Sequence, residues 1–286
     1  MNEFVIITDS ASDLPASLAK EMEVEVIQLE VNMEGDLRLN DEVDVKEFYD
    51  YLRAKHSAKT SAVNMDRFME HFGSVAAGGK DILYVSFSSG LSATYMAAKN
   101  AAEEIMEKYP DVRIVVVDSL CASLGQGLFV KLAYDKKKEG ATIDEIAAYL
   151  EEKKPNLAHW FTVDDLFFLK RGGRVSAATA VVGTMLQIKP VLHVDDAGKL
   201  ISMDKARGRQ GSLKALLERM RATAIDPASQ TVYISHGDCY DDAKRLADMI
   251  SEELGVTDVL ISEIGPVIGA HAGPGTVALF FLASER

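Results

Sequence analysis

Apolar and polar positions follow two different periods over the first half of the chain. Short runs rich in β-branched and aromatic residues predict strands at 4–8, 24–31, 82–87 and 114–117. Apolar residues recur at helical spacing over 43–55, 65–76, 92–108, 124–138 and 143–153. The last two strand runs are apolar throughout, as expected of parallel strands that are covered on both faces. We therefore expect an α/β domain with a mostly parallel sheet.

A different pattern begins after Lys153-Lys154-Pro155-Asn156, where the proline ends the preceding helix. This break predicts two α/β domains, at 1–155 and 156–286. Strands are predicted at 157–162, 190–194, 200–205, 231–235, 259–264 and 277–282, and helices at 177–186, 213–223 and 241–254. The polar turn 195–199 joins two adjacent strands as a hairpin, so the second domain should contain a mixed sheet.

Composition and charge limit the possible partners. The chain has 286 residues, of which 48% are hydrophobic, and its mean hydropathy is +0.01, as is typical of a well-packed soluble protein. Its 44 acidic and 31 basic residues give a net charge of −13. This charge argues against a nucleic-acid or anionic-membrane partner. An anionic ligand must therefore be bound by local groups.

The sequence offers no sign of export or membrane insertion. Residues 1–8 lack the basic region of a signal peptide, and the apolar run 277–283 is far shorter than the roughly 20 residues of a membrane helix. Cys121 and Cys239 form neither a CxxC pair nor a disulfide framework. We expect a cytoplasmic protein without a transmembrane segment.

Near the C-terminus, His271 stands in a stretch of glycine, proline and small apolar residues, 264–276. Glycine and proline fix a backbone path, and the lack of charge indicates a loop that faces something apolar or closely approached. The imidazole could donate a hydrogen bond to the polar end of a ligand. Alternatively, it is a buried histidine that backbone carbonyls satisfy.

Polar residues follow several of the predicted strands, at the edge where open α/β sheets bind ligands. Ser88-Ser89-Gly90 leads from a strand into a helix, so that hydroxyl and backbone N–H groups converge in a way that suits an anion. Lys59-Thr60-Ser61 adds a hydroxyl pair between two predicted helices. Asp118-Ser119 ends another strand, and Asp9-Ser10 follows the first one. Ser12 or Asp13 is the predicted N-cap of the next helix.

One basic cluster stands out in the acidic chain. Leu169-Lys170-Arg171-Gly172-Gly173-Arg174 places glycines between two guanidinium groups, which could then reach a phosphate or the carboxylates of a partner. The alternative is a solvated basic turn.

Several catalytic and cofactor signatures are missing. The chain has no GxxxxGK[ST] loop, no HExxH and no GxSxG, and its six histidines lack metal-ligand spacing. Residues 273–278 match GxGxxA, but a strand-like run follows where a dinucleotide site requires a helix. Ser235-His236-Gly237-Asp238 gathers the residue types of a catalytic triad, yet neighbours on a strand point to opposite faces. We expect no catalytic residue, metal or cofactor.

Taken together, the motifs resemble those of the DegV family of bacterial fatty-acid-binding proteins. The resemblance spans essentially the whole chain and rests on seven motifs in order: Thr8-Asp9-Ser10, Lys59-Thr60-Ser61, Ser88-Ser89-Gly90-Leu91-Ser92, Asp118-Ser119, the cluster 169–174, Lys189-Pro190, and the glycine-rich stretch 265–275 around His271.

The resemblance implies a long-chain fatty acid buried between two α/β domains. Its carboxylate would be bound by Thr60, Ser61, Ser88, Ser89, Gly90 and His271. Secondary site candidates are Asp9, Ser10, Asp118, Ser119 and Gly269. One departure is local: family members often continue the Thr-Ser motif with Gln-Pro, whereas this chain has Ala62-Val63-Asn64.

The resemblance also implies a role in phospholipid metabolism. Some members present the bound carboxylate to a separate ATP-binding fatty acid kinase subunit of the dihydroxyacetone-kinase-like type. Arg171 and Arg174 would then form the docking or transfer surface. Two alternatives remain open: a serine acyl hydrolase or transferase that uses Ser89 with His271, and a binding protein for a phosphorylated metabolite.

Overall fold

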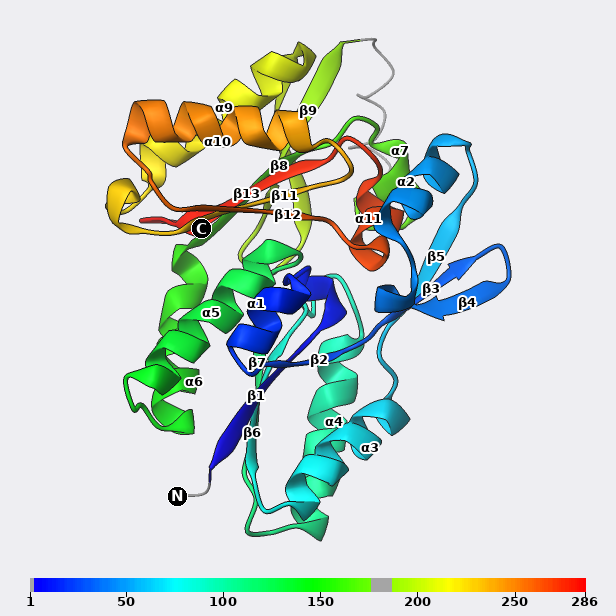
Figure 1. The fold of residues 1–286 in the computed structure, drawn as a ribbon, viewed down its shortest axis with the longest axis vertical. Helices are drawn as coiled ribbons and strands as arrows, with labels where there is room; N and C mark the ends of the chain where they lie inside the picture. The colour runs from blue at the N-terminus through cyan, green and yellow to red at the C-terminus, as the bar shows by residue number, and fades with distance from the viewer. Residues whose placement is uncertain (1–2, 176–186) are drawn as a thin grey trace.

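The computed structural model describes residues 3–175 and 187–286, and it has the expected α/β architecture with two large sheets (Figure 1). The first sheet contains β1 (Phe4–Asp9), β2 (Glu25–Ile27), β6 (Asp81–Ser86) and β7 (Ile114–Asp118) in the order β2-β1-β6-β7. All of its strand pairs are parallel. The predicted parallel sheet is therefore confirmed. The helix predicted at 177–186 lies outside the described residues.

Side-chain alternation along the parallel strands explains why helices cover both faces. Ile7, Ile82 and Tyr84 pack with α3 (Met65–Ala77) and α4 (Thr94–Lys108). Ile6 and Leu83, one position along on their strands, pack on the opposite face with α5 (Leu124–Lys138) and α6 (Ile143–Lys153). The bounds of α5 and α6 agree with the helical spacing of the sequence.

The second sheet is mixed, as predicted. Its order is β10-β9-β8-β13-β11-β12, and only the β11/β12 pair among its described pairs is parallel. The strands are β8 (Leu157–Thr162), β9 (Ile188–Val194), β10 (Leu200–Arg207), β11 (Val232–His236), β12 (Val259–Glu263) and β13 (Val277–Leu282). Two helices, α9 (Gly208–Thr223) and α10 (Tyr240–Leu254), cover one face of this sheet.

A small third sheet was not expected from the sequence. It has the order β4-β3-β5, from β3 (Glu30–Met33), β4 (Asp36–Leu39) and β5 (Ala58–Ser61). The predicted strand 24–31 is therefore wrong as one element, since its two ends belong to different sheets. Lys59-Thr60-Ser61 forms a strand, not a loop between helices, because β5 pairs with β3. The helix α2 (Val45–Arg53) packs on this sheet.

Two local predictions are also corrected. The 264–276 stretch is not a loop: it contains α11 (Pro266–Ala272), which begins with Pro266 and ends at Gly273, where φ is +80°. Neither Ser12 nor Asp13 caps a helix. Instead Asp9 caps a 3-10 turn (Ser10–Ser12), and α1 (Ala16–Glu21) starts after Pro15. The remaining short elements are α7 (Phe167–Arg171) and the 3-10 turns Asn40–Glu42, Lys154–Asn156 and Pro227–Ser229.

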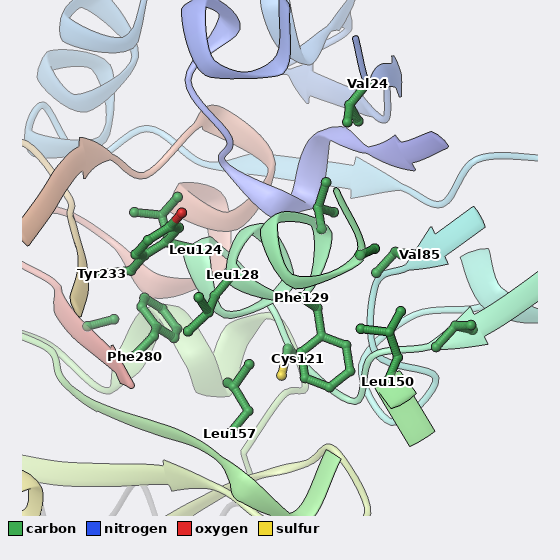
Figure 2. Close-up of a cluster of buried hydrophobic side chains, with 14 of the residues drawn as sticks. Val24, Val85, Cys121, Leu124, Leu128, Phe129, Leu150, Leu157, Tyr233 and Phe280 are labelled. Carbon is green, nitrogen blue, oxygen red and sulfur yellow. The ribbon is translucent and has the colours of Figure 1, made fainter. Parts of the chain in front are cut away.

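Helix α5 lies between the two large sheets and contributes to one continuous core. Figure 2 shows Leu124, Leu128 and Phe129 of α5 in the cluster that also contains Val85 of the first sheet and Phe280 of the second. The helix approaches β13 closely, because a Cβ atom added at Gly125 would lie 2.8 Å from Cδ1 of Phe280. Glycine at this position lets one helix serve both sheets.

A buried polar contact also joins the two halves of the chain. The Ser123 hydroxyl lies 2.5 Å from Oδ2 of Asp13 and 2.9 Å from the Ser235 hydroxyl, and the Gly265 N–H donates to Oδ1 of Asp13 over 2.9 Å. Burial raises the pKa of Asp13 to about 8, so its carboxyl group is protonated at neutral pH. The protonated carboxyl group of Asp13 can then donate a hydrogen bond to the Ser123 hydroxyl. The Ser123 hydroxyl can in turn donate its own proton to the Ser235 hydroxyl.

The close approach at Gly125 can be tested by substitution. Gly125→Ala should lower the free energy of unfolding by about 1 kcal/mol or more, because overpacking against Phe280 exceeds the helix-propensity gain of alanine. Gly211→Ala is the matched control in α9, since its added Cβ meets nothing nearer than Ala206 at 3.7 Å and should leave stability unchanged or raised. Urea unfolding followed by circular dichroism measures both. Equal changes in the two variants would contradict the close contact.

Candidate functional site

An apolar cavity of about 400 Å³ lies between the two halves of the chain. Its walls come from α7, α11, β5, β8 and β13 and from the segments that lead into α4 and α5. Most of its lining is apolar, including Leu29, Phe87, Leu91, Phe161, Val267 and Ala278. A cavity of this size and composition suits a largely apolar ligand with few polar groups.

A threonine–histidine pair forms a polar point in the cavity wall. Oγ1 of Thr60 on β5 lies 2.7 Å from Nε2 of His271 on α11, and both residues line the cavity. Burial, followed by the charges of Arg174 and Arg171, lowers the pKa of His271 to about 4. The imidazole is therefore neutral at physiological pH. The backbone of Gly172 closes over the ring, since a Cβ there would lie 2.2 Å from Nδ1 of His271.

Arg174 supplies a positive charge at the same point. Arg174 lines the cavity and is partly buried, and its guanidinium group donates hydrogen bonds to the carbonyl oxygens of Gly172 and Leu91. Burial lowers its pKa. Within 3–175 and 187–286, no carboxylate forms an ion pair with Arg174. A partly desolvated cation without a counter-ion favours an anionic ligand.

The other predicted carboxylate ligands lie differently. Ser61 lines the cavity, but Ser88, Ser89 and Gly90 do not belong to its lining. The Ser88 hydroxyl donates to the carbonyl oxygen of Gly198 over 2.8 Å, and Ser89 is exposed. These contacts attach the turn to the β9–β10 hairpin. Carboxylate binding by Ser88, Ser89 and Gly90 stays a prediction that the cavity geometry does not favour.

The secondary candidates do not line the cavity. Asp9 is fully buried and accepts hydrogen bonds from Tyr84 Oη (2.6 Å) and the Phe87 N–H (3.0 Å), which holds Phe87 in the wall. The Ser10 hydroxyl accepts from the N–H of Leu29 over 2.9 Å. The other three are Asp118, which accepts from the Ser89 N–H, Ser119, which donates to the Ser86 carbonyl, and Gly269, which packs against Tyr49.

Four polar residues of the lining were not singled out from the sequence: Ser92, Ser123, His159 and Thr276. Ser92 is the last residue of one of the seven motifs, and its hydroxyl contacts Thr94 Oγ1 at 2.9 Å. His159 gives no local signal, because it is one polar residue in an apolar strand run. Arg174 was assigned to docking and not to the cavity.

The geometry bears on the two alternative functions. A serine hydrolase requires a hydroxyl paired with the histidine, but the hydrogen-bonded partner of His271 is Thr60 and not Ser89. A phosphorylated metabolite would face a mostly apolar wall. The described residues contain no group of three or more His, Cys, Asp and Glu side chains placed to hold a metal ion. In the same part of the chain, no helix has the length and apolarity to cross a membrane.

Comparisons with known proteins cover the whole chain. The family model described as "Uncharacterised protein, DegV family" matches residues 3–284. A DegV domain-containing protein from Clostridium perfringens is 46% identical, over 100% of this chain and 99% of the relative. A DegV lipid binding protein from Thermotoga maritima has a TM-score of 0.88 at 30% identity, with 99% of both chains covered. A DegV family protein from Thermus thermophilus, described as binding fatty acid, has a TM-score of 0.87 at 30% identity, covering 99% and 100%.

Because burial keeps His271 neutral, we can predict the pH at which it takes up a proton. In histidine-labelled protein followed by NMR, His271 should not protonate until the pH approaches 4. Because its folded pKa lies below the unfolded value of about 6.5, this residue should reduce stability as the pH falls from about 6.5 to 4, by at most about 1.4 kcal/mol per pH unit. His271→Gln assigns the signal, and Arg174→Gln should raise the pKa. Titration of native His271 near 6.5 would contradict the buried neutral imidazole.

Proposed function

The chain belongs to the DegV family, and on that premise we propose that it binds one long-chain fatty acid in the apolar cavity. The carboxylate lies at the polar point formed by Thr60, Ser61, Arg174 and His271, and the acyl chain extends along the apolar wall. The observation that carries this proposal is the partly buried guanidinium of Arg174, which lacks an ion-pair partner among the described residues at the edge of an apolar cavity. A long-chain fatty acid has both an anionic group for this guanidinium and an apolar chain for the cavity wall.

The polar point can supply the hydrogen bonds that a buried carboxylate needs, although His271 and the hydroxyl groups in it are neutral. Neutral His271 can donate from Nε2 to Oγ1 of Thr60, and the Thr60 hydroxyl is then free to donate to the ligand. Arg174 contributes a charge-assisted bond. Such bonds are needed because an unpaired buried carboxylate would be highly unfavourable. Each buried methylene of the chain adds about 0.8 kcal/mol of gross stabilisation.

The lipid content of the purified protein tests this directly. Denaturing organic extraction followed by mass spectrometry should release a fatty acid in near-stoichiometric amount. Extracts of folded protein that contain no fatty acid would contradict the proposal.

Two arginines three residues apart give a matched pair. Arg174→Gln should weaken fatty acid binding by about 1–3 kcal/mol, because a buried charged partner is lost. Arg171→Gln removes the same charge from an exposed side chain and should leave binding unchanged. Titration of delipidated protein with a fluorescent fatty acid measures both. Equal losses would indicate a general electrostatic effect and not a contact in the cavity.

The same proposal includes a partner, an ATP-dependent kinase subunit that phosphorylates the bound carboxylate. The support is the surface of α7. Phe167 is 58% exposed, and the Arg171 guanidinium lies over the rings of Phe167 and Phe168, at 5.8 and 5.0 Å from their centroids. Arginine and exposed aromatic residues are typical of protein interfaces. Gly172, directly after this helix, covers His271, so a partner on α7 would reach the carboxylate end.

The docking role of Arg171 has its own test. With a cognate kinase subunit and ATP, the lipid-loaded protein should yield acyl phosphate, and Arg171→Ala should slow this reaction while lipid content stays unchanged. The isolated protein should hydrolyse no ATP. Lys108→Ala, another single charge removed at a distant helix end, serves as the control. Full activity of Arg171→Ala, or loss of its lipid, would refute this assignment.

A further inference from the structure

His159 places a polar side chain in an otherwise apolar part of the cavity wall. It lies on β8, is 4% exposed, and lines the cavity together with Phe161 two residues further along the same strand. Its ring lies 4.4 Å from the ring of Phe280 and 5.9 Å from that of Phe161, measured between centroids. The imidazole therefore packs against two phenyl rings.

This imidazole is neutral and is unpaired within the described part of the chain. Burial, with smaller contributions from Arg286 and His193, lowers the pKa of His159 well below its usual value. Neither ring nitrogen of His159 has a hydrogen-bond partner among the described residues; Nδ1 is fully enclosed by protein atoms, whereas Nε2 is not, so Nε2 is the nitrogen that a ligand in the cavity can reach. Buried polar side chains are nearly always paired, and leaving one unpaired is unfavourable. The site therefore favours a ligand that supplies the missing hydrogen bond.

The position of His159 is well separated from the carboxylate end. β8 and β13 are antiparallel, with Thr162 opposite Val277 and His159 opposite Phe280. Thr276 and the α11 helix that carries His271 precede Val277, whereas His159 lies three residues deeper along β8. At about 3.3 Å per residue this is roughly 10 Å along the strand. The ligand atoms next to His159 therefore belong to the acyl chain and not to the carboxylate.

Two hydroxyl groups of the lining, those of Ser123 and Thr276, already have partners within the protein, and the unpaired Nδ1 of His271 is covered by the Gly172 backbone. The Ser123 hydroxyl lies between Asp13 and Ser235, and Thr276 donates to backbone carbonyls of Ala272 and Gly273. His159 differs from them, because a plain hydrocarbon chain would leave its imidazole without a bond.

We infer, on the basis of the proposed fatty acid binding, that this cavity prefers a long-chain fatty acid that carries a hydroxyl group part-way along its chain, hydrogen-bonded to His159. A hydroxyl group both donates and accepts, so it can pair with either tautomer of a neutral imidazole. The rest of the chain still meets apolar carbon, so the preference depends on where the hydroxyl stands. His159 is then the specificity-determining residue of the acyl-chain end.

The test compares stearic acid with a set of hydroxystearic acids that differ only in hydroxyl position, each titrated into delipidated native protein and into His159→Phe. One position, or two adjacent ones, should bind native protein more tightly than stearic acid. That preference should fall by about tenfold in His159→Phe, the effect of losing one hydrogen bond. His159→Gln, which keeps a donor and an acceptor, should retain part of it. The imidazole ¹⁵N signal of His159 should shift only with the preferred isomer.

Each other outcome overturns the inference. Stearic acid that binds native protein as tightly as every hydroxystearic acid shows that His159 is only part of the wall. A preference that persists in His159→Phe assigns it to another residue. If His159→Phe does not fold, His159→Leu takes its place, and the isomer series on native protein still shows whether the preference exists. If neither stearic acid nor any hydroxystearic acid binds native protein, fatty acid binding itself is refuted. This outcome is distinct from binding without a preference for a hydroxyl group.

Discussion

The packing of α5 between two sheets is the contact on which the rest of the structure depends. A helix normally presents one apolar stripe to one layer, but α5 contributes to a core that contains Val85 of the first sheet and Phe280 of the second. This double packing requires a short distance to β13, which Gly125 permits. Because Phe280 also contacts His159 in the cavity wall, the same contact sets the position of the deep end of the cavity.

Burial between the two halves of the chain also determines the charge state of the site. It keeps His271 neutral and Asp13 protonated, whereas Arg174, whose pKa burial lowers, is an arginine and stays charged. Among the described residues, the cavity lining therefore has one positive group beside neutral hydrogen-bond donors. An anion gains a charge-assisted bond at that point, and a cation gains nothing. This difference arises from desolvation and not from the net charge of −13, which opposes an anion.

The sequence predicted those elements whose own residues carry the signal. The apolar spacing of α5 and the continuous apolar runs of the parallel strands were sufficient, so the fold class followed from periodicity. The α11 helix was missed because Gly269 within it has low helix propensity, and the helix depends on packing against Tyr49 and on its ends. Strand β5 was missed because its partner, β3, is distant in the chain. For the site, motifs indicated Thr60, Ser61 and His271. Only tertiary packing shows that Arg174 lines the cavity whereas Arg171 is exposed.

The two ends of the cavity contribute to recognition in different ways. Burial of methylene groups is non-directional and roughly proportional to area, so it supplies affinity but discriminates weakly between chains of similar length. Hydrogen bonds discriminate more strongly, because a buried polar group that loses its partner is destabilising. In the proposed complex with a fatty acid, Arg174 and His271 apply this constraint to the carboxylate and fix the direction in which the chain enters. In the same proposed complex, His159, a second polar group deep in the apolar wall, applies this constraint to the chain itself.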